Sequence, residues 1–158
     1  MDPAALKTEL LGLLRGELAL AEKAHRTTTE AATHEEAKPE NDKDTRALEQ
    51  SYLARGQALR ATELRAAVAE VESMRVPRRS DEGRAVLGAR VTVVDEREER
   101  STYWLAAHGG GSRLASGQVQ VVTPRSPVGR ALVGKTVGDE AEVIRAGKTR
   151  TVRVVAID

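Results

Sequence analysis

Five acidic side chains lie close together in one short stretch of the sequence, around Pro39, the only proline between Pro3 and Pro77. A proline disfavours the helical conformation at the residue before it and lacks a backbone N–H donor, so two helical segments are expected to meet here at a turn. Carboxylate oxygens are ligands that Mg²⁺ prefers, and a small number of them holds the ion weakly enough to share it with another protein. The acids of this turn, which we call the tip (residues 33–46), are Glu35, Glu36, Glu40, Asp42 and Asp44.

Two other interpretations of the tip are open besides a Mg²⁺ site. The acids could form an ordinary solvated helix cap. His34 beside Glu35 and Glu36 could also suggest a metal site, but a single imidazole on a turn next to acids is more often only solvated. The position of the most acidic turn, at the far end of two long helical segments, favours a functional role.

The segments on either side of the tip predict an antiparallel coiled coil. Asp2 and Pro3 are favoured residues at a helix start, and Asn41 to about Met74 is rich in strong helix formers without an interior proline. At about 1.5 Å per residue, helices of ~30 residues would extend roughly 45 Å. Heptad spacing predicts a seam formed by Leu6, Leu10, Leu13, Glu17, Leu20, Ala24 and Ala31 in the first helix and by Leu53, Leu64, Ala67, Val71 and Met74 in the second, with Leu48, Tyr52 and Leu59 slightly off it.

A change in composition divides the chain into two units. We expect the coiled coil over residues 1–76, a linker over 77–84, and a second domain over 85–158. Ser126, Pro127 and Gly134 suit the cap, first position and end of one short helix, and Gly147 suits a tight hairpin. The second domain is therefore predicted to be α+β with a mainly antiparallel sheet, its strands lying over residues 89–94, 101–107, 119–123, 141–145 and 149–157.

Composition excludes several classes of protein. The chain of 158 residues has no Cys, which excludes disulfides and thiolate metal sites, and its net charge of +1 gives no general attraction to nucleic acid. We found neither a hydrolase or cofactor motif nor an apolar run that would cross a membrane. The expectation is a cytoplasmic monomer without a stably bound cofactor.

Residues 126–135, Ser-Pro-Val-Gly-Arg-Ala-Leu-Val-Gly-Lys, are followed by Val137-Gly138-Asp139. This motif closely resembles the C-terminal signature of the bacterial Gre (GreA/GreB) transcript cleavage factors. In the same register, Glu40-Asn41 and Glu49-Gln50 have the spacing of matching pairs in the family's tip and descending helix. The resemblance implies an N-terminal antiparallel coiled coil with an acidic tip and a C-terminal domain with an FKBP-like fold.

The resemblance also implies a partner and a mechanism. The C-terminal domain would dock on RNA polymerase at the mouth of the secondary channel, and the coiled coil would reach the active centre, giving indirect contact with nascent RNA and DNA. Glu40 would help to hold a Mg²⁺ ion shared with the polymerase during cleavage of backtracked RNA. The polymerase would be the enzyme. Contact with it is expected from Ser126, Pro127, Val128, Gly129 and Arg130.

One position of the tip departs from the family pattern. The family's tip carries Asp, two residues, then Glu-Asn, and here Ala37 stands at the position of that Asp. Glu35, Glu36, Asp42 or Asp44 could supply the missing oxygen. A second interpretation therefore keeps the docking and drops the cleavage: a secondary-channel regulator that alters initiation, pausing or nucleotide entry.

Two further functions are compatible with the sequence. An FKBP-like fold can house a prolyl isomerase or chaperone, but Tyr103 and Trp104 are the only aromatic residues of the second domain, and as neighbours they should lie on opposite strand faces. Direct RNA contact by the coiled coil would use its basic side chains. That contact would be with phosphates only, made by Arg46, Arg55, Arg60 and Arg65.

Overall fold

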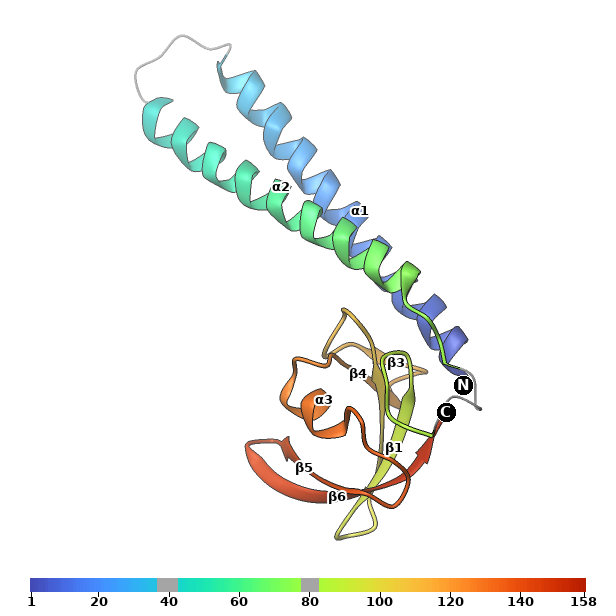
Figure 1. Cartoon of the computed structure of the whole chain (residues 1–158). Helices are drawn as coiled ribbons and strands as arrows, with labels where there is room; N and C mark the ends of the chain where they lie inside the picture. Colours follow the sequence, from blue (N-terminus) through green and yellow to red (C-terminus); the bar gives the residue numbers. More distant parts are fainter. Residues whose placement is uncertain (37–42, 78–82) are drawn as a thin grey trace. The chain divides into compact units, whose positions relative to one another are not determined.

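The computed structural model describes residues 1–36, 43–77 and 83–158 (Figure 1). The chain packs as two compact units, one formed by residues 13–68 and the other by residues 1–12 together with 69–158. The sequence-based division into residues 1–76, 77–84 and 85–158 stays a prediction, because residues 78–82 of its linker lie outside the described residues.

Two long helices precede the sheet, as predicted. Helix α1 (Pro3–Glu36) begins directly after Asp2, whose Oδ1 accepts hydrogen bonds from the backbone N–H groups of Ala4 (2.7 Å) and Ala5 (3.0 Å). This cap satisfies donors that have no partner within the helix. Helix α2 (Lys43–Ser73) runs antiparallel to α1 within residues 13–68. No helix of the described ranges is both long and apolar enough to cross a membrane.

From residue 13 onward, the seam of α1 lies one residue away from the predicted one, whereas Leu6 and Leu10 are buried as predicted. Leu13 and Leu20 are 44% and 70% exposed, Leu53 of α2 is 55% exposed, and Glu17, Ala24 and Ala31 are also exposed, so these six predictions were wrong. Leu64, Ala67 and Val71 of α2 and Met74 directly after it are buried, as predicted. Leu13 and Leu14 are both leucines, so side-chain size alone could not choose between the two registers. One set of buried and partly buried side chains recurs at alternating spacings of three and four residues, which marks a coiled-coil seam. Its members are Leu14, Leu18, Ala21, His25, Thr28 and Ala32 in α1 and Gln50, Ala54, Gln57, Ala61, Leu64 and Val68 in α2.

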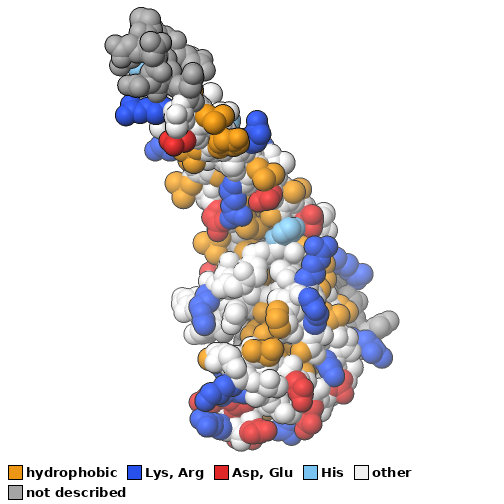
Figure 2. Space-filling model, turned by 90° about the vertical axis from the view of Figure 1, so that its left-hand side faces the viewer, with side chains coloured by type: hydrophobic (Ala, Val, Ile, Leu, Met, Phe, Trp, Pro, Cys, Tyr) orange, Lys and Arg blue, Asp and Glu red, His pale blue; other side chains and the backbone are white. Residues whose placement is uncertain are grey.

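Ion pairs flank this seam on both sides. Arg60 donates to Glu17 at 3.0 Å, and both residues directly precede a seam position. Arg65 donates to Glu22 at 3.1 Å, and both directly follow one. Such pairing is expected when two helices pack antiparallel in this register. Each exposed pair contributes little free energy alone, so their main effect is on register. Figure 2 shows hydrophobic, acidic and basic side chains interspersed on one face of the molecule.

The second unit contains a six-stranded sheet in the order β3-β4-β2-β1-β6-β5. Strands β2 and β4 are parallel and the other neighbours are antiparallel, which confirms the mainly antiparallel α+β prediction. The helix α3 (Pro127–Leu132) follows β4. The strands are β1 (Arg90–Asp95), β2 (Arg100–Leu105), β3 (Arg113–Leu114), β4 (Val119–Val122), β5 (Glu140–Arg145) and β6 (Lys148–Ile157).

The two faces of the sheet are covered differently. One face carries an apolar core to which Val91, Tyr103 and Leu132 belong, so α3 packs on this side. Trp104 is fully buried on the other face and donates its indole N–H to the Gly88 carbonyl at 2.9 Å. Tyr103 and Trp104 therefore lie on opposite faces, as predicted. The start of α1 belongs to this unit, since the carboxylate of Glu9 accepts from the backbone N–H of Ala115 at 3.1 Å.

Strand β3 was not predicted. It has only two residues, too few to show alternation, and its turn uses positive φ at Ala115 (51°) and Ser116 (55°), which are not typical turn residues for that conformation. The β5–β6 hairpin was predicted. Its turn residues Ala146 (φ 50°) and Gly147 (φ 72°) have the two positive φ values of a tight hairpin turn that matches strand twist.

The unpaired seam residue Gln57 generates a stability prediction. Its Oε1 atom is buried and has no hydrogen-bond partner among the described residues. Because an unsatisfied buried acceptor destabilises the folded state, Gln57→Leu should raise the local unfolding free energy of the hairpin by about 1–2 kcal/mol. Hydrogen exchange of amides in residues 50–65 measures this change. Glu63→Leu, at an exposed position of the same helix, is the control and should have little effect; equal protection in both variants would contradict the prediction.

A second prediction concerns the turn between α3 and β5. The Asp139 carboxylate accepts from the Thr136 backbone N–H (2.8 Å) and hydroxyl (3.0 Å). These hydrogen bonds hold the pKa of Asp139 below its ordinary value of 3.8. A lowered pKa means that the ionised form is favoured by folding, so this stabilisation is present at neutral pH and is lost as the pH falls through the folded-state pKa.

Asp139→Asn should therefore lower the urea midpoint at pH 7, and the difference from the native protein should shrink under strongly acidic conditions. Urea unfolding at both pH values measures it. The control Glu140→Gln changes an adjacent exposed acid and should leave the midpoint unchanged. A difference that persisted undiminished in acid would show that the carboxylate charge is not responsible.

Candidate functional site

The turn into α3 is held by one hydroxyl group. Ser126 Oγ donates to the Thr123 carbonyl oxygen (2.8 Å) and accepts from the Gly129 backbone N–H (3.1 Å). Pro127 occupies the first turn of the helix, as the sequence predicts. Because the hydroxyl is engaged in both directions, it caps the helix and is not poised as a nucleophile.

Gly129 is required by a close approach of two backbone segments. A β-carbon at this position would lie 1.9 Å from the Thr123 carbonyl oxygen, which no side chain can accommodate. The glycine therefore lets α3 pack directly against the end of β4. Gly134 ends the helix region with φ +80°, in the left-handed conformation predicted for it.

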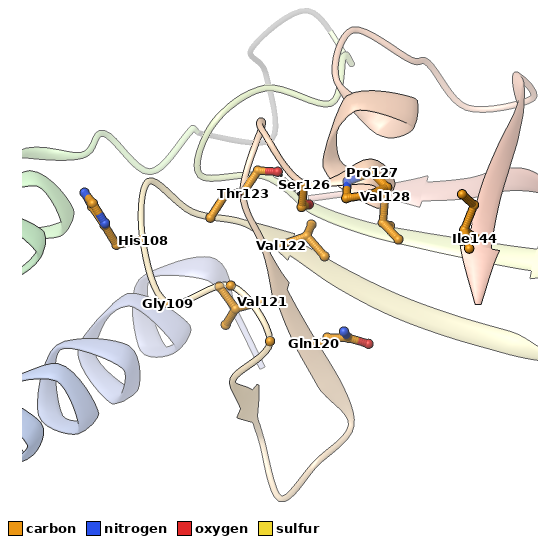
Figure 3. A pocket seen from close by; sticks show the side chains of 12 residues that line it. His108, Gly109, Gln120, Val121, Val122, Thr123, Ser126, Pro127, Val128 and Ile144 are labelled. Carbon is orange, nitrogen blue, oxygen red and sulfur yellow. Dashed lines mark hydrogen bonds between the residues drawn. The ribbon is translucent and has the colours of Figure 1, made fainter. Parts of the chain in front are cut away.

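A groove of about 570 Å³ runs beside the N-terminal turn of α3. Figure 3 shows Val122, Pro127 and Val128 near one another, with Ile144 on strand β5 and His108 at the opposite end. The volume is within the range of pockets that take a drug-sized group or a peptide side chain. The groove is lined by His108, Gly109, Gly110, Gly111, Gln120, Val121, Val122, Thr123, Ser126, Pro127, Val128 and Ile144.

The five residues expected to contact a partner differ in exposure. Pro127 and Arg130 are exposed, Ser126 and Val128 are partly buried, and Gly129 is buried. Arg130 donates from Nε to the Arg125 carbonyl oxygen at 2.9 Å, which fixes the base of its guanidinium group beside the helix. Direct contact with a partner is thus open to Pro127 and Arg130, whereas Gly129 acts on the shape of the backbone.

The far wall of the groove was missed by the sequence analysis. His108 Nε2 lies 2.9 Å from Glu70 Oε2 of α2, within the same compact unit. Gly109 (φ +81°) leaves room for Leu10, since a β-carbon there would lie 2.5 Å from Leu10 Cδ1. A run of three glycines was visible in the sequence, but nothing in it indicated that this loop would face α3.

The lining of the groove is mostly uncharged. His108 is the only ionisable side chain among the described residues that line the groove, and Ser126 is already used as a cap. None of these lining residues is Phe, Tyr or Trp, so the groove lacks the large aromatic floor that a proline ring would need. Apolar side chains from α3, β4 and β5 offer instead a surface for a partner's side chains.

The tip can be described only in part. Glu40 and Asp42 lie outside the described residues, as does Ala37. Glu36 and Asp44 fall within α1 and α2, and their side chains are not described. Among the described residues there is no cluster of acidic or histidine side chains suited to a metal ion. The assignments of the tip acids stay predictions.

Comparison with known proteins connects the groove to a family. Residues 80–158 match the family model for "Transcription elongation factor, GreA/GreB, C-term". Transcription elongation factor GreA of Magnetococcus marinus is 41% identical over 80 residues, which is 50% of this chain and 48% of the relative. GreA of Sinorhizobium medicae is 33% identical over 99 residues, 62% of this chain and 60% of the relative. The chain thus spans about half the length of the curated relatives it matches.

Solved structures are also similar. The GreA factor homolog 1 (Gfh1) protein of Thermus thermophilus is 21% identical, with 99% of this chain and 94% of that one covered and a TM-score of 0.42. The elongation factor GreA/GreB from Nitrosomonas europaea is 23% identical, with 60% and 78% covered and a TM-score of 0.39. Since the family model covers residues 80–158 of 158, the chain belongs to the GreA/GreB family of transcription elongation factors.

Proposed function

We propose that this protein is a cytoplasmic transcription elongation factor that binds RNA polymerase through its secondary channel and acts on stalled or backtracked complexes. Family membership over residues 80–158 supports the proposal. The relatives' names describe elongation factors, and the groove of this chain is built within the matched residues and beside Glu70.

The observation that carries the proposal is the rigid, outward-facing turn of α3. Ser126 and Gly129 fix its backbone against Thr123, and Pro127 and Arg130 are exposed on it. A surface that is already ordered loses little conformational entropy on binding. An exposed guanidinium beside apolar side chains suits a partner surface with acidic and apolar groups. By its family membership, the protein would be an accessory factor and the polymerase would be the enzyme.

The tip would supply chemistry to the polymerase. Carboxylates are the donors that Mg²⁺ prefers, so the acidic residues present there fit an ion shared with the polymerase, with Glu40 as the first candidate ligand. Such an ion would stabilise the negative charge that develops on the RNA phosphate during hydrolysis. Glu35, Glu36, Asp42 and Asp44 are the other carboxylates that could contribute.

A second candidate function is regulation without cleavage. Its motivation is Ala37, which provides no oxygen at a position where the family pattern has a carboxylate. The docking surface would be the same, and the protein would change initiation, pausing or nucleotide entry by occupying the channel.

The remaining alternatives find less support. A prolyl isomerase would need an aromatic floor that the lining of the groove does not provide. Direct binding of RNA phosphates along α2 would use the arginine side chains of that helix. Arg60 and Arg65, however, form ion pairs with Glu17 and Glu22. Crosslinking from the RNA 3′ end in a polymerase complex would detect RNA contact along α2.

The proposal assigns polymerase binding to the α3 region and chemistry to the tip, and this gives the first functional prediction. Arg130→Glu should raise the dissociation constant for RNA polymerase by about tenfold or more, because it reverses a charge at the proposed interface. Arg153→Glu, at an exposed position of β6, is the matched control and should bind as the native protein does. Glu40→Ala should also bind normally and compete with native protein. Competition binding measures all three; loss of binding in Glu40→Ala would make the tip a docking element.

The cleavage question has its own test. Polymerase stalled and backtracked on a template is mixed with native protein or with Ala37→Asp, and short 3′ RNA fragments are quantified. If the protein is a regulator, only Ala37→Asp should produce fragments. Efficient cleavage by native protein, abolished in Glu40→Ala, would instead establish it as a cleavage factor. Neither variant touches the proposed docking surface, so binding controls should be unchanged.

A further inference from the structure

A second cavity, of about 160 Å³, lies in the sheet domain and is strongly basic. Three arginines from three different strands line it: Arg100 of β2, Arg113 of β3 and Arg145 of β5. No acidic side chain belongs to its lining. Strands β3 and β5 are the two edges of the sheet, so the fold brings together charges that are far apart in strand order.

Strand register explains why these side chains meet. Arg113 pairs with Gln120, and Gln120 pairs with Tyr103, which places the three side chains in a row on one face of the sheet. Tyr103 belongs to the apolar core on that face. Arg145 reaches the same region from β5, since its Nη1 donates to Ser101 Oγ of β2 at 2.9 Å. The cavity is therefore the polar end of the face that carries the core.

The arginine charges are not neutralised by neighbouring acids. Within the described part of the chain, none of the three arginines forms an ion pair. Asp95 is already engaged by Arg150 at 2.8 Å and by the backbone N–H groups of Arg97 and Glu99. Like charges held together without a counterion repel one another, which an anion in the cavity would relieve.

The neutral lining supplies further hydrogen-bond donors. Ser101 contributes a hydroxyl group, and Gln118 and Gln120 contribute amides. Tyr103 lines the same cavity and is 4% exposed. Converging guanidinium forks with hydroxyl and amide donors are the arrangement that recognises phosphate oxygens.

We propose that this cavity binds the terminal phosphate of a small phosphorylated molecule, with Arg113 and Arg145 as its principal ligands. The cavity is smaller than the roughly 300 Å³ or more typical of sites that enclose a whole drug-sized ligand, so it would hold the phosphate and leave the rest outside. A terminal phosphate presents three oxygens to donors arriving from several strands. A backbone phosphodiester presents two, and both of its chains would have to leave a cavity of this size.

The test uses inorganic phosphate and adenosine 5′-monophosphate as probes, with the full-length protein and isothermal titration calorimetry. Both probes should bind at the same site and compete. Arg113→Gln and Arg145→Gln should each weaken binding by about tenfold, the loss expected for one charge-assisted hydrogen bond. The control Arg153→Gln removes an exposed arginine outside the lining and should leave affinity unchanged. Thermal unfolding of each variant checks that the domain is intact.

The outcomes are distinguishable from those of the proposed function. Arg113→Gln leaves α3 untouched, so polymerase binding should persist where phosphate binding is lost. If inorganic phosphate binds and adenosine 5′-monophosphate does not, the ligand is the free ion and the proposed monoester is wrong. If single-stranded DNA without a terminal phosphate competes equally well, the site reads backbone phosphates and the proposal fails. Equal weakening by Arg153→Gln, or no saturable binding of either probe, would also overturn it.

Discussion

The close approach of Gly129 to the carbonyl group of Thr123 is the constraint on which the proposed interface depends. Only a residue without a β-carbon permits it, and it brings the first turn of α3 against the end of β4. The Ser126 hydroxyl bridges the same two segments. Together they turn a flexible connection into a fixed edge of the groove, so the shape offered to a partner is set by backbone contacts and not by the side chains that make the contact.

The helical unit is held together in a different way. Its larger apolar seam residues, Leu14, Leu18 and Leu64, lie at the end away from the tip, whereas Ala21, His25, Thr28 and Gln57 fill the seam further along. Burial per residue falls in that direction, and with it the hydrophobic stabilisation. Local opening should therefore begin near the tip. The outer leucines of the hairpin do not compensate, because they are exposed to solvent.

The sequence predicted what depends on local chemistry. Asp2 at the first helix start, Ser126 at the third, and Gly147 in the last hairpin each have a conformational preference that was confirmed. The sequence-based prediction failed where tertiary packing decides which of two similar residues is buried. Leu13 and Leu14 are equivalent by composition, and only the partner helix selects Leu14. His108 lies next to Glu70 of α2, and Arg145 of β5 next to Ser101 of β2. These partners are far apart in the sequence, so no spacing in it could indicate the groove wall or the basic cavity.

The order of the strands has a consequence for how the domain is made. Strand β1 lies between β2 and β6, and its residues 91–95 pair with residues 152–157. During synthesis, β1 therefore leaves the ribosome long before β6. Until β6 is made, the β1–β2 hairpin has unpaired backbone groups along the edge of β1 that does not pair with β2. Contacts between segments so distant in sequence slow folding, because the intervening chain has to be closed into a loop first. During that interval the waiting hairpin is open to pairing with other chains, so crowding of nascent chains should matter more for this domain than for the helices, which can form as they emerge.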